Sequence, residues 1–332
     1  IEVDIFIPSF PDLQSHFGLT PFWVQLTLSL NFVAYAFSSL FMGVLGDRLC
    51  RRNVILGSLV LFNVGSLLCV FAPSFAFMLI GRVFQGAGIA GCATLGFVVI
   101  TDEFPVEKQP GLLGVFNGIT TMSMAAAPVI GSYVNLWCGW RANFVVLLVL
   151  GLVGLVASCM FLPRSKAVME PLPISLHIYT PLLRSKTYMR LMAAVVMICC
   201  SYWIFIGMAP ILYMDGLGVP LHEFGFYQGA IVLPFALVSL LSPKLMAWMG
   251  YVRSYRVGLG FVMLGMVSML VLILTGYSSP KAITATMMVV AMGLVFPINL
   301  LYPAALFAVE GAKGRAAAAL NAVRLVYTAI AL

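Results

Sequence analysis

The sequence predicts an all-α membrane protein, and its composition carries most of that prediction. Of the 332 residues, 62% are hydrophobic and only 9% are charged, and the mean hydropathy is +1.07. A soluble domain carries roughly 45–50% apolar and about 25% charged residues. Because part of any soluble fold must face water, a core of this length could not hide so much apolar surface. These values exclude soluble, disordered, collagen-like and disulfide-scaffold proteins.

Apolar runs bounded by proline, glycine and charged residues give the order of the expected helices. A membrane-spanning helix needs about 20 apolar residues, so a chain of this length accommodates about 11 or 12 spans. We expect eleven, at about 1–7, 22–45, 54–72, 76–101, 111–135, 142–162, 191–213, 223–243, 257–276, 282–309 and 316–332. The first and last runs reach the ends of the sequence without a loop, so we expect both of these spans to be truncated.

A polar stretch at about 163–190 separates six of these runs from the other five. We therefore expect an N-terminal helical bundle over 1–162, a connector over 163–190 and an incomplete C-terminal bundle over 191–332. Two parallel six-span halves of this kind are a known transporter plan.

The lysines and arginines are distributed unequally over the loops. Two, Arg141 and Lys281, fall on one side of the predicted membrane, and Arg82 and Arg324 lie within spans. The other side carries Arg48, Arg51, Arg52, Lys108, Arg164, Lys166, Arg184, Lys186, Arg190, Lys244, Arg253, Arg256, Lys313 and Arg315. The positive-inside rule makes this basic side cytoplasmic, together with the connector. Topology therefore explains the net charge of +7, and nucleic acid is not an expected partner.

A loop with an acid inside a basic run is the most specific local signal. Residues 43–52 read G-V-L-G-D-R-L-C-R-R, so that a glycine at a helix end precedes Asp47 and its arginines. A carboxylate there can accept hydrogen bonds from arginine or lie at a helix N-terminus. We expect a latch that closes the cytoplasmic side, formed by Gly43, Asp47, Arg48, Arg51 and Arg52.

This loop resembles the signature of the major facilitator superfamily, G-x-x-x-D-R-x-G-R-R, with Cys50 in place of the second glycine. A second stretch, from Arg82 to Gly88, is similar to the R-x-x-Q-G-x-G of the same superfamily. An arginine within a bilayer must face a polar interior or a partner. Gln85 lies one turn further along the same helix face, and Gly86 and Gly88 permit close helix contact. The resemblance implies a major facilitator fold.

An acidic residue near the beginning of the chain is the expected partner of Arg82. Asp4 and Pro8 form a D-x-x-x-P pattern seen in the drug-exporting branch of the superfamily. We expect Asp4 and Arg82 to couple transport to protons, since a changing environment would let the carboxylate load and release a proton. Glu2 lies about 200° from Asp4 around a helix and so would face elsewhere. We therefore rank Asp4 above Glu2.

The fifth run carries Ala127, Pro128, Gly131 and Ser132, a partial match to the G-P-x-x-G-G antiporter motif. Small residues with a proline inside a helix permit a kink and close packing. Together with P-x-x-x-Q-x-T-x-S over 21–29 and F-P-x-N over 296–299, these patterns resemble the Bcr/CflA subfamily of proton-coupled drug exporters. The resemblance implies a bacterial inner-membrane antiporter of twelve spans that moves small molecules. We expect it to be a monomer in the lipid bilayer.

Polar and aromatic residues within the spans are candidates for the substrate cavity. Aromatic rings suit flat, lipophilic and cationic substrates through stacking and cation–π contact. The candidates are Asn31, Tyr35, Gln85, Asn117, Tyr202, Gln228 and Asn299, with Trp203 and Tyr302 as further aromatic residues.

One alternative stays open at this stage, and an enzyme is not expected. The same fold could carry a specific metabolite or siderophore in either direction, and Arg324 within the last run would favour an anionic substrate. A membrane enzyme would need clustered acids or histidines, whereas His16, His177 and His222 lie far apart. The sequence contains no P-loop, and its cysteines have no metal-ligand spacing. We therefore expect no metal and no cofactor, with the proton gradient as the energy source.

Overall fold

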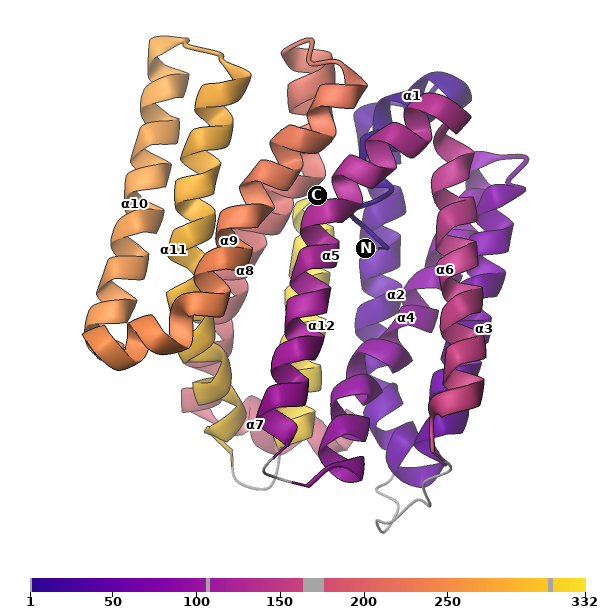
Figure 1. Ribbon diagram of the computed structural model, residues 1–332, viewed down its shortest axis with the longest axis vertical. Coiled ribbons are helices and arrows are strands. Elements are labelled where there is room, and N and C mark those ends of the chain that lie inside the picture. The colour runs from indigo at the N-terminus through magenta and orange to yellow at the C-terminus, as the bar shows by residue number, and fades with distance from the viewer. Residues whose placement is uncertain (1, 106–107, 164–175, 310–312) are drawn as a thin grey trace. The chain divides into compact units, whose positions relative to one another are not determined.

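The computed structural model describes residues 2–105, 108–163, 176–309 and 313–332, and within these ranges it contains helices and no strand (Figure 1). The elements are η1 (Ile7–Ser9), α1 (Phe10–Phe17), α2 (Pro21–Arg48), α3 (Arg51–Val70), α4 (Phe75–Glu103), α5 (Gln109–Cys138), α6 (Trp140–Phe161), η2 (Leu176–Tyr179), α7 (Thr180–Arg184), α8 (Lys186–Pro210), η3 (Ile211–Gly216), α9 (Leu221–Met249), α10 (Tyr251–Thr275), α11 (Pro280–Phe307) and α12 (Lys313–Ala331).

Each expected run from 22–45 onward is a helix, which confirms the all-α prediction. Eight helices of the described chain are long and apolar enough to cross a membrane. They are α2, α3, α4, α6, α8 with its continuation η3, α9, α10 and α11. The total of eleven spans stays a prediction.

The beginning of the chain differs from the expected end of a span. Residues 2–6 form consecutive turns, followed by η1 and α1. The N–H groups of Phe6 and Ile7 both donate to the carbonyl of Val3, at 3.2 and 3.3 Å. Pro8 has no N–H to donate to the carbonyl of Asp4, which is the bond that would continue an α-helix here.

Helix ends follow local sequence signals. The side chain of Ser74 accepts the N–H of Phe77 at 3.3 Å and so caps α4. Gly276 adopts the left-handed conformation (φ 67°) at the end of α10, and Gly250 (φ 78°) makes the turn between α9 and α10. After Pro210 the α8 helix continues as the π-helical turn η3.

The contacts divide the chain into two interleaved units. Unit 1 comprises Ile1–Ser15, Phe116–Trp140 and Leu191–Ala304, and unit 2 comprises His16–Val115, Arg141–Arg190 and Ala305–Leu332. These units group residues by their contacts, and each combines segments from different parts of the chain. The division into two bundles at 163–190 stays a prediction.

In unit 2, α4 packs against both α2 and α3, and α12 packs along α2. Glycine makes the α3–α4 contact close. A Cβ atom on Gly65 would lie 2.6 Å from the backbone nitrogen of Gln85 and 2.7 Å from the carbonyl oxygen of Gly81. The two backbones therefore meet where a side chain would hold them apart.

In unit 1, α9 packs against α5, also through glycine. A Cβ atom on Gly225 would lie 2.8 Å from the carbonyl oxygen of Pro128, and one on Gly229 would lie 3.2 Å from that of Ala125. The α10–α11 contact uses Gly258 in the same way against Gly293.

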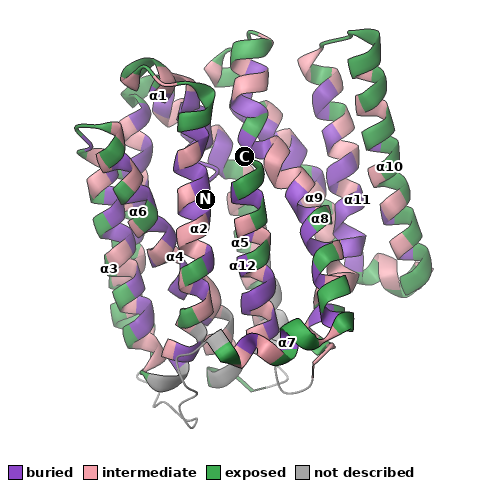
Figure 2. Ribbon diagram, turned by 180° about the vertical axis from the view of Figure 1, so that it is seen from behind, coloured by how far each residue is buried: buried purple, intermediate pink, exposed green. Residues whose placement is uncertain are grey.

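Apolar side chains remain exposed along the helices, where buried and exposed residues alternate (Figure 2). Only 17% of the most apolar stretch of α6 and 11% of that of α10 are buried. A soluble protein would hide such faces in a core. A membrane protein leaves them to the lipid chains, which are as apolar as leucine.

We expect Gly65→Ala to lower the stability of the protein by about 1–3 kcal/mol, because the added methyl group separates α3 from α4. Gly57→Ala on the same helix is the matched control, since nothing lies within 4 Å of a Cβ at that position. Alanine favours a helix over glycine, so this control should be at least as stable as the parent. Thermal unfolding in detergent measures both variants, and a Gly65→Ala protein as stable as Gly57→Ala would contradict the packing.

Candidate functional site

A buried arginine network lies at the centre of unit 2. Arg82 on α4 is fully buried, and its guanidinium Nη1 donates to Oε1 of Gln85 at 2.7 Å. Its Nε donates to the carbonyl of Thr27 on α2 at 3.4 Å. The amide of Gln85 in turn donates to Oγ of Ser66 on α3 at 2.8 Å. One charged side chain therefore joins three helices through hydrogen bonds.

Asn31 ties the backbone of the arginine to the neighbouring helix. Its side-chain amide donates to the carbonyl oxygen of Arg82 at 3.1 Å, and Asn31 itself is fully buried. Gly86 lies directly against the backbone of Asn31, and a Cβ atom there would come within 3.0 Å of the Asn31 carbonyl carbon. The R-x-x-Q-G pattern thus supplies the charge, its acceptor and the close approach of α2.

Asp4 belongs to unit 1 and lies in the turns before η1. Its side chain is only 4% exposed, whereas Glu2 is half-buried. Because residues 2–6 are turns, the 200° helical separation of the two acids does not apply. Burial distinguishes them instead, and it favours the same residue.

Helix α5 supports the segment that carries Asp4. Gly131 lies against the backbone of Ile5, and a Cβ atom on Gly131 would come within 2.9 Å of the Ile5 carbonyl carbon. The side-chain amide of Asn135, one turn further along α5, donates to Oδ2 of Asp12 on α1 at 2.6 Å. Gly131 of the antiporter-like motif therefore allows the segment that carries Asp4 to pack closely against α5.

An aromatic cluster of unit 1 accompanies the carboxylate. Tyr202 on α8 stacks on Phe235 of α9, with ring centroids 6.5 Å apart and an angle of 21° between the rings. Trp203 lies edge-on to Tyr202 at 6.3 Å. Asp4 is close enough to Tyr202 to interact with it electrostatically. A buried carboxylate that interacts electrostatically with one of two stacked rings is suited to a proton or to a lipophilic cation.

Two uncharged polar side chains are buried at the contact of α5 with α9. Gln228 is 1% exposed, and neither its amide oxygen nor its nitrogen has a hydrogen-bond partner among the described residues. Ser132 is fully buried, and its hydroxyl likewise has none there. Gln228 lies seven residues, or two turns, before Phe235, so both occupy one face of α9. Leaving a buried polar group without a hydrogen bond costs about 1–3 kcal/mol. We therefore expect Gln228 and Ser132 to bind a ligand.

The predicted pair of Asp4 with Arg82 spans the two units, and it stays a prediction. Asp4 is 4% exposed and Arg82 is fully buried.

The predicted cytoplasmic latch lies partly outside the described side chains. Those of Gly43, Asp47 and Arg48, at the end of α2, are not described. Arg51 and Arg52 begin α3, and the guanidinium of Arg52 donates to the carbonyl of Cys159 near the end of α6 at 2.6 Å. The basic run therefore binds a helix end, where a cation meets the negative end of the helix dipole.

The remaining cavity candidates fall in different places. The amide of Asn299 on α11 donates to Oγ of Ser242 on α9 at 2.9 Å, so it joins two helices. Tyr35 and Tyr302 are half-buried, and the side chain of Asn117 is not described. Gln85 accepts the hydrogen bond from Arg82 described above, and its role in the substrate cavity stays a prediction.

Sequence reasoning missed several residues of these clusters. Ser66 and Phe235 carry no motif of their own, although the two-turn spacing of Phe235 from Gln228 was a usable signal. Tyr179, in the polar connector, has no sequence pattern that would have identified it. Its hydroxyl donates to the carbonyl of Leu40 on α2 at 2.9 Å. Burial raises the pKa of this hydroxyl above its ordinary value, and the charge of Arg315 partly lowers it.

A family model described as Major Facilitator Superfamily matches residues 1–332. The chain belongs to this superfamily. The resemblance inferred from the loop signature is thereby confirmed.

Named relatives are found among bacterial resistance proteins. The multidrug resistance protein MdtL of Klebsiella pneumoniae (strain 342) is 24% identical over 241 residues, which are 72% of this chain and 60% of that protein. A chloramphenicol resistance protein of Pseudomonas aeruginosa is 24% identical over 302 residues, which are 90% of this chain and 71% of that protein. The matched region thus spans less than two thirds of the first of these relatives.

Solved transporters share the fold of this member of the superfamily. The xylose transporter XylE from E. coli, in a partially occluded inward-open conformation, has a TM-score of 0.76 at 12% identity, covering 99% of this chain and 86% of the other. A bacterial homologue of the human lysosomal transporter Spinster has a TM-score of 0.73 at 16% identity, covering 99% and 76%. At these identities the likeness concerns the fold.

We expect Gln85→Leu to destabilise the protein by about 3 kcal/mol, because the buried Arg82 charge loses its short acceptor. Ser66→Ala is the matched control. It removes only an uncharged acceptor of Gln85 and should cost about 1 kcal/mol. Unfolding by heat or denaturant in detergent measures both, and equal stabilities of the two variants would contradict the role of the charge.

Proposed function

We propose that this chain forms most of a secondary transporter that exports drugs or small amphipathic compounds in exchange for protons. Membership of the superfamily supports transport. The names of the similar proteins, multidrug and chloramphenicol resistance, support this class of substrate. The protein would work without a cofactor and as a monomer, and its partners would be protons, the lipid bilayer and the compounds it moves.

The proposed architecture has twelve spans, of which about eleven fall in this chain. The halves 1–162 and 191–332 would rock around a site near the middle of the membrane, with the connector on the cytoplasmic side of a bacterial inner membrane. The unequal distribution of lysine and arginine over the loops supports this orientation.

The observation that carries the proposal is the buried Asp4 carboxylate, which interacts electrostatically with Tyr202. In one state the carboxylate takes a proton from the outside. In the other it releases that proton and attracts a cationic or polarisable substrate, which the rings of Tyr202 and Phe235 hold by stacking. Because one carboxylate serves the proton and the substrate in turn, their movements are opposed. Gly131 contributes by placing the Asp4 segment against α5.

Arg82 supplies a second, permanent charge in this mechanism. Its hydrogen bonds to Gln85 and Thr27 fix the guanidinium, so it cannot leave its place when the surroundings change. A fixed positive charge favours the ionised form of a carboxylate near it. Arg82 would therefore promote proton release from Asp4 in the conformation that brings the two together.

The proposed cytoplasmic gate comprises Gly43, Asp47, Arg48, Arg51 and Arg52. The contact of Arg52 with the carbonyl of Cys159 supports a role at a helix end. Breaking and remaking such contacts would open and close the inner side.

The substitution Asp4→Asn tests the coupling, because the amide keeps the shape of the side chain but cannot carry the proton. We expect it to abolish the accumulation of a fluorescent cationic dye driven by a pH gradient across proteoliposomes. Exchange of labelled for unlabelled dye without a gradient should be weaker but still measurable, because the rings of Tyr202 and Phe235 still hold the dye, and this exchange shows that the variant folds.

Glu2→Gln is the matched control and should retain driven transport, since Glu2 is the neighbouring but less buried acid. Undiminished pH-driven transport by Asp4→Asn would refute the assignment. Thermal stabilisation by a panel of dyes, antibiotics, sugars and siderophores separates drug export from transport of a single metabolite.

We further expect Gln228→Leu to raise the KM for transport about tenfold, since the amide would lose its hydrogen bond to the substrate. The folded protein should be at least as stable as the parent, because a buried amide without a protein partner is removed. Asn299→Leu is the control: it breaks a bond to Ser242 and should destabilise the protein instead. A stable Gln228→Leu variant with an unchanged KM would contradict the role.

A further inference from the structure

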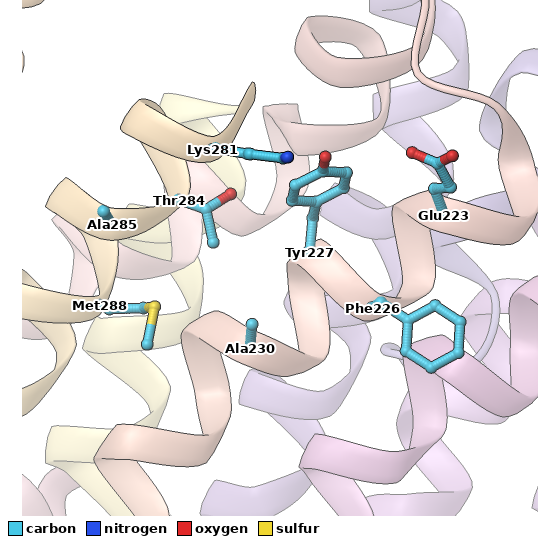
Figure 3. A pocket seen from close by; sticks show the side chains of 8 residues that line it. All are labelled: Glu223, Phe226, Tyr227, Ala230, Lys281, Thr284, Ala285 and Met288. Carbon is cyan, nitrogen blue, oxygen red and sulfur yellow. The ribbon is translucent and has the colours of Figure 1, made fainter. Parts of the chain in front are cut away.

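A pocket of about 410 Å³ lies between the first turns of α9 and α11, entirely within unit 1 (Figure 3). Glu223 and Tyr227 of α9 and Lys281 of α11 line one end of it. Phe226 and Ala230 of α9 line the rest, together with Met288 of α11. The pocket therefore has a charged end and an apolar body.

The wall behind this pocket is held in place by buried contacts. The hydroxyl of Tyr213 on η3 lies 2.7 Å from that of Thr284, which also lines the pocket. The ring of Tyr213 packs against Tyr227 at 5.6 Å and against Phe224 at 6.1 Å. Tyr213 is 1% exposed. This wall of the pocket is thus fixed by contacts of the fold.

The two charges of the pocket do not form an ion pair with each other in the described structure. Glu223 has a contact of 3.9 Å with the neighbouring His222, and both of those side chains are 52% exposed. Figure 3 shows the Lys281 nitrogen on one side of the Tyr227 ring and the Glu223 carboxylate on the other. A ligand with a negative and a positive group could therefore meet both charges together.

An exposed apolar stripe continues the pocket along α9. Phe226, Leu233 and Leu237 are 54%, 51% and 53% exposed, and their spacing of seven and four residues puts them on one face. Because α9 is long and apolar enough to span the membrane, hydrocarbon chains are the medium that covers this face. The charged end then lies at the level of the lipid headgroups, where helix ends meet water.

We propose that this pocket binds a zwitterionic phospholipid with a primary-ammonium headgroup, its acyl chains lying along the α9 stripe. Lys281 binds the phosphate and Glu223 binds the ammonium group. On the predicted topology Lys281 lies on the side with few basic residues, so the lipid belongs to the outer leaflet.

The pair of charges discriminates between headgroups. A primary ammonium donates hydrogen bonds to the Glu223 carboxylate, whereas a choline headgroup has no N–H to donate. An anionic glycerol headgroup has hydroxyl groups but no cation, so nothing in it offsets the repulsion between its phosphate and Glu223. We therefore expect the order ethanolamine, then choline, then glycerol.

Native mass spectrometry of the delipidated full chain tests this order. The probes are phosphatidylethanolamine, phosphatidylcholine and phosphatidylglycerol with identical acyl chains. The parent protein should retain the ethanolamine lipid about tenfold more than the choline lipid, the ratio that one additional charge-assisted contact gives. Equal retention of the two, or tighter binding of the glycerol lipid, would overturn the proposal.

Variants assign the effect to the pocket. Glu223→Gln should abolish the preference for ethanolamine over choline, and Lys281→Gln should weaken both lipids about equally. Glu103→Gln and Lys244→Gln are exposed control substitutions of the same kinds and should change nothing. The site would be refuted if a control variant lost the preference for ethanolamine over choline, or if Glu223→Gln kept it. The readout is binding alone, so the inference stands or falls independently of proton-coupled transport.

Discussion

The burial of one charge constrains much of this structure. Arg82 lies fully inside a set of apolar helices, where an unpaired guanidinium would be too costly to keep. Gln85 on the same helix provides the acceptor, and Thr27 and Ser66 extend the bonds to α2 and α3. These bonds are short enough only because Gly65 and Gly86 let the backbones meet. In unit 2 the hydrogen bonds of the Arg82 charge therefore depend on the close packing of the helices at glycine.

Unit 1 contains the other polar groups of the proposed mechanism. Asp4 interacts electrostatically with Tyr202, and Gln228 and Ser132 are buried without a hydrogen-bond partner among the described residues. In unit 2 the hydrogen bonds of Arg82 to Gln85 and Thr27 fix one charge, whereas on the proposed function Asp4 and Gln228 of unit 1 bind the proton and the substrate.

The exposed surface is governed by the lipid rather than by water. Helices α6 and α10 leave most of their apolar side chains uncovered, and the stripe on α9 leads from the hydrocarbon to the charges of Glu223 and Lys281. The apolar composition that excluded a soluble protein thus also provides the surface for acyl chains in the proposed lipid site, while the two charges bind the headgroup.

The sequence by itself predicted the family and the helices after the first expected span, and it singled out Arg82, Gln85 and Gly131 as candidates. Apolar runs and prolines act locally, and a charge in a membrane span can hardly be neutral in function. Only the tertiary structure revealed that Asp4 lies in turns, that Gly131 supports this segment and that Asn299 binds Ser242. It also decided which distant residues meet, such as Tyr202 with Phe235 and Glu223 with Lys281 around one pocket. The physical reason is that helix periodicity selects a face, whereas the partner of that face depends on how distant helices pack.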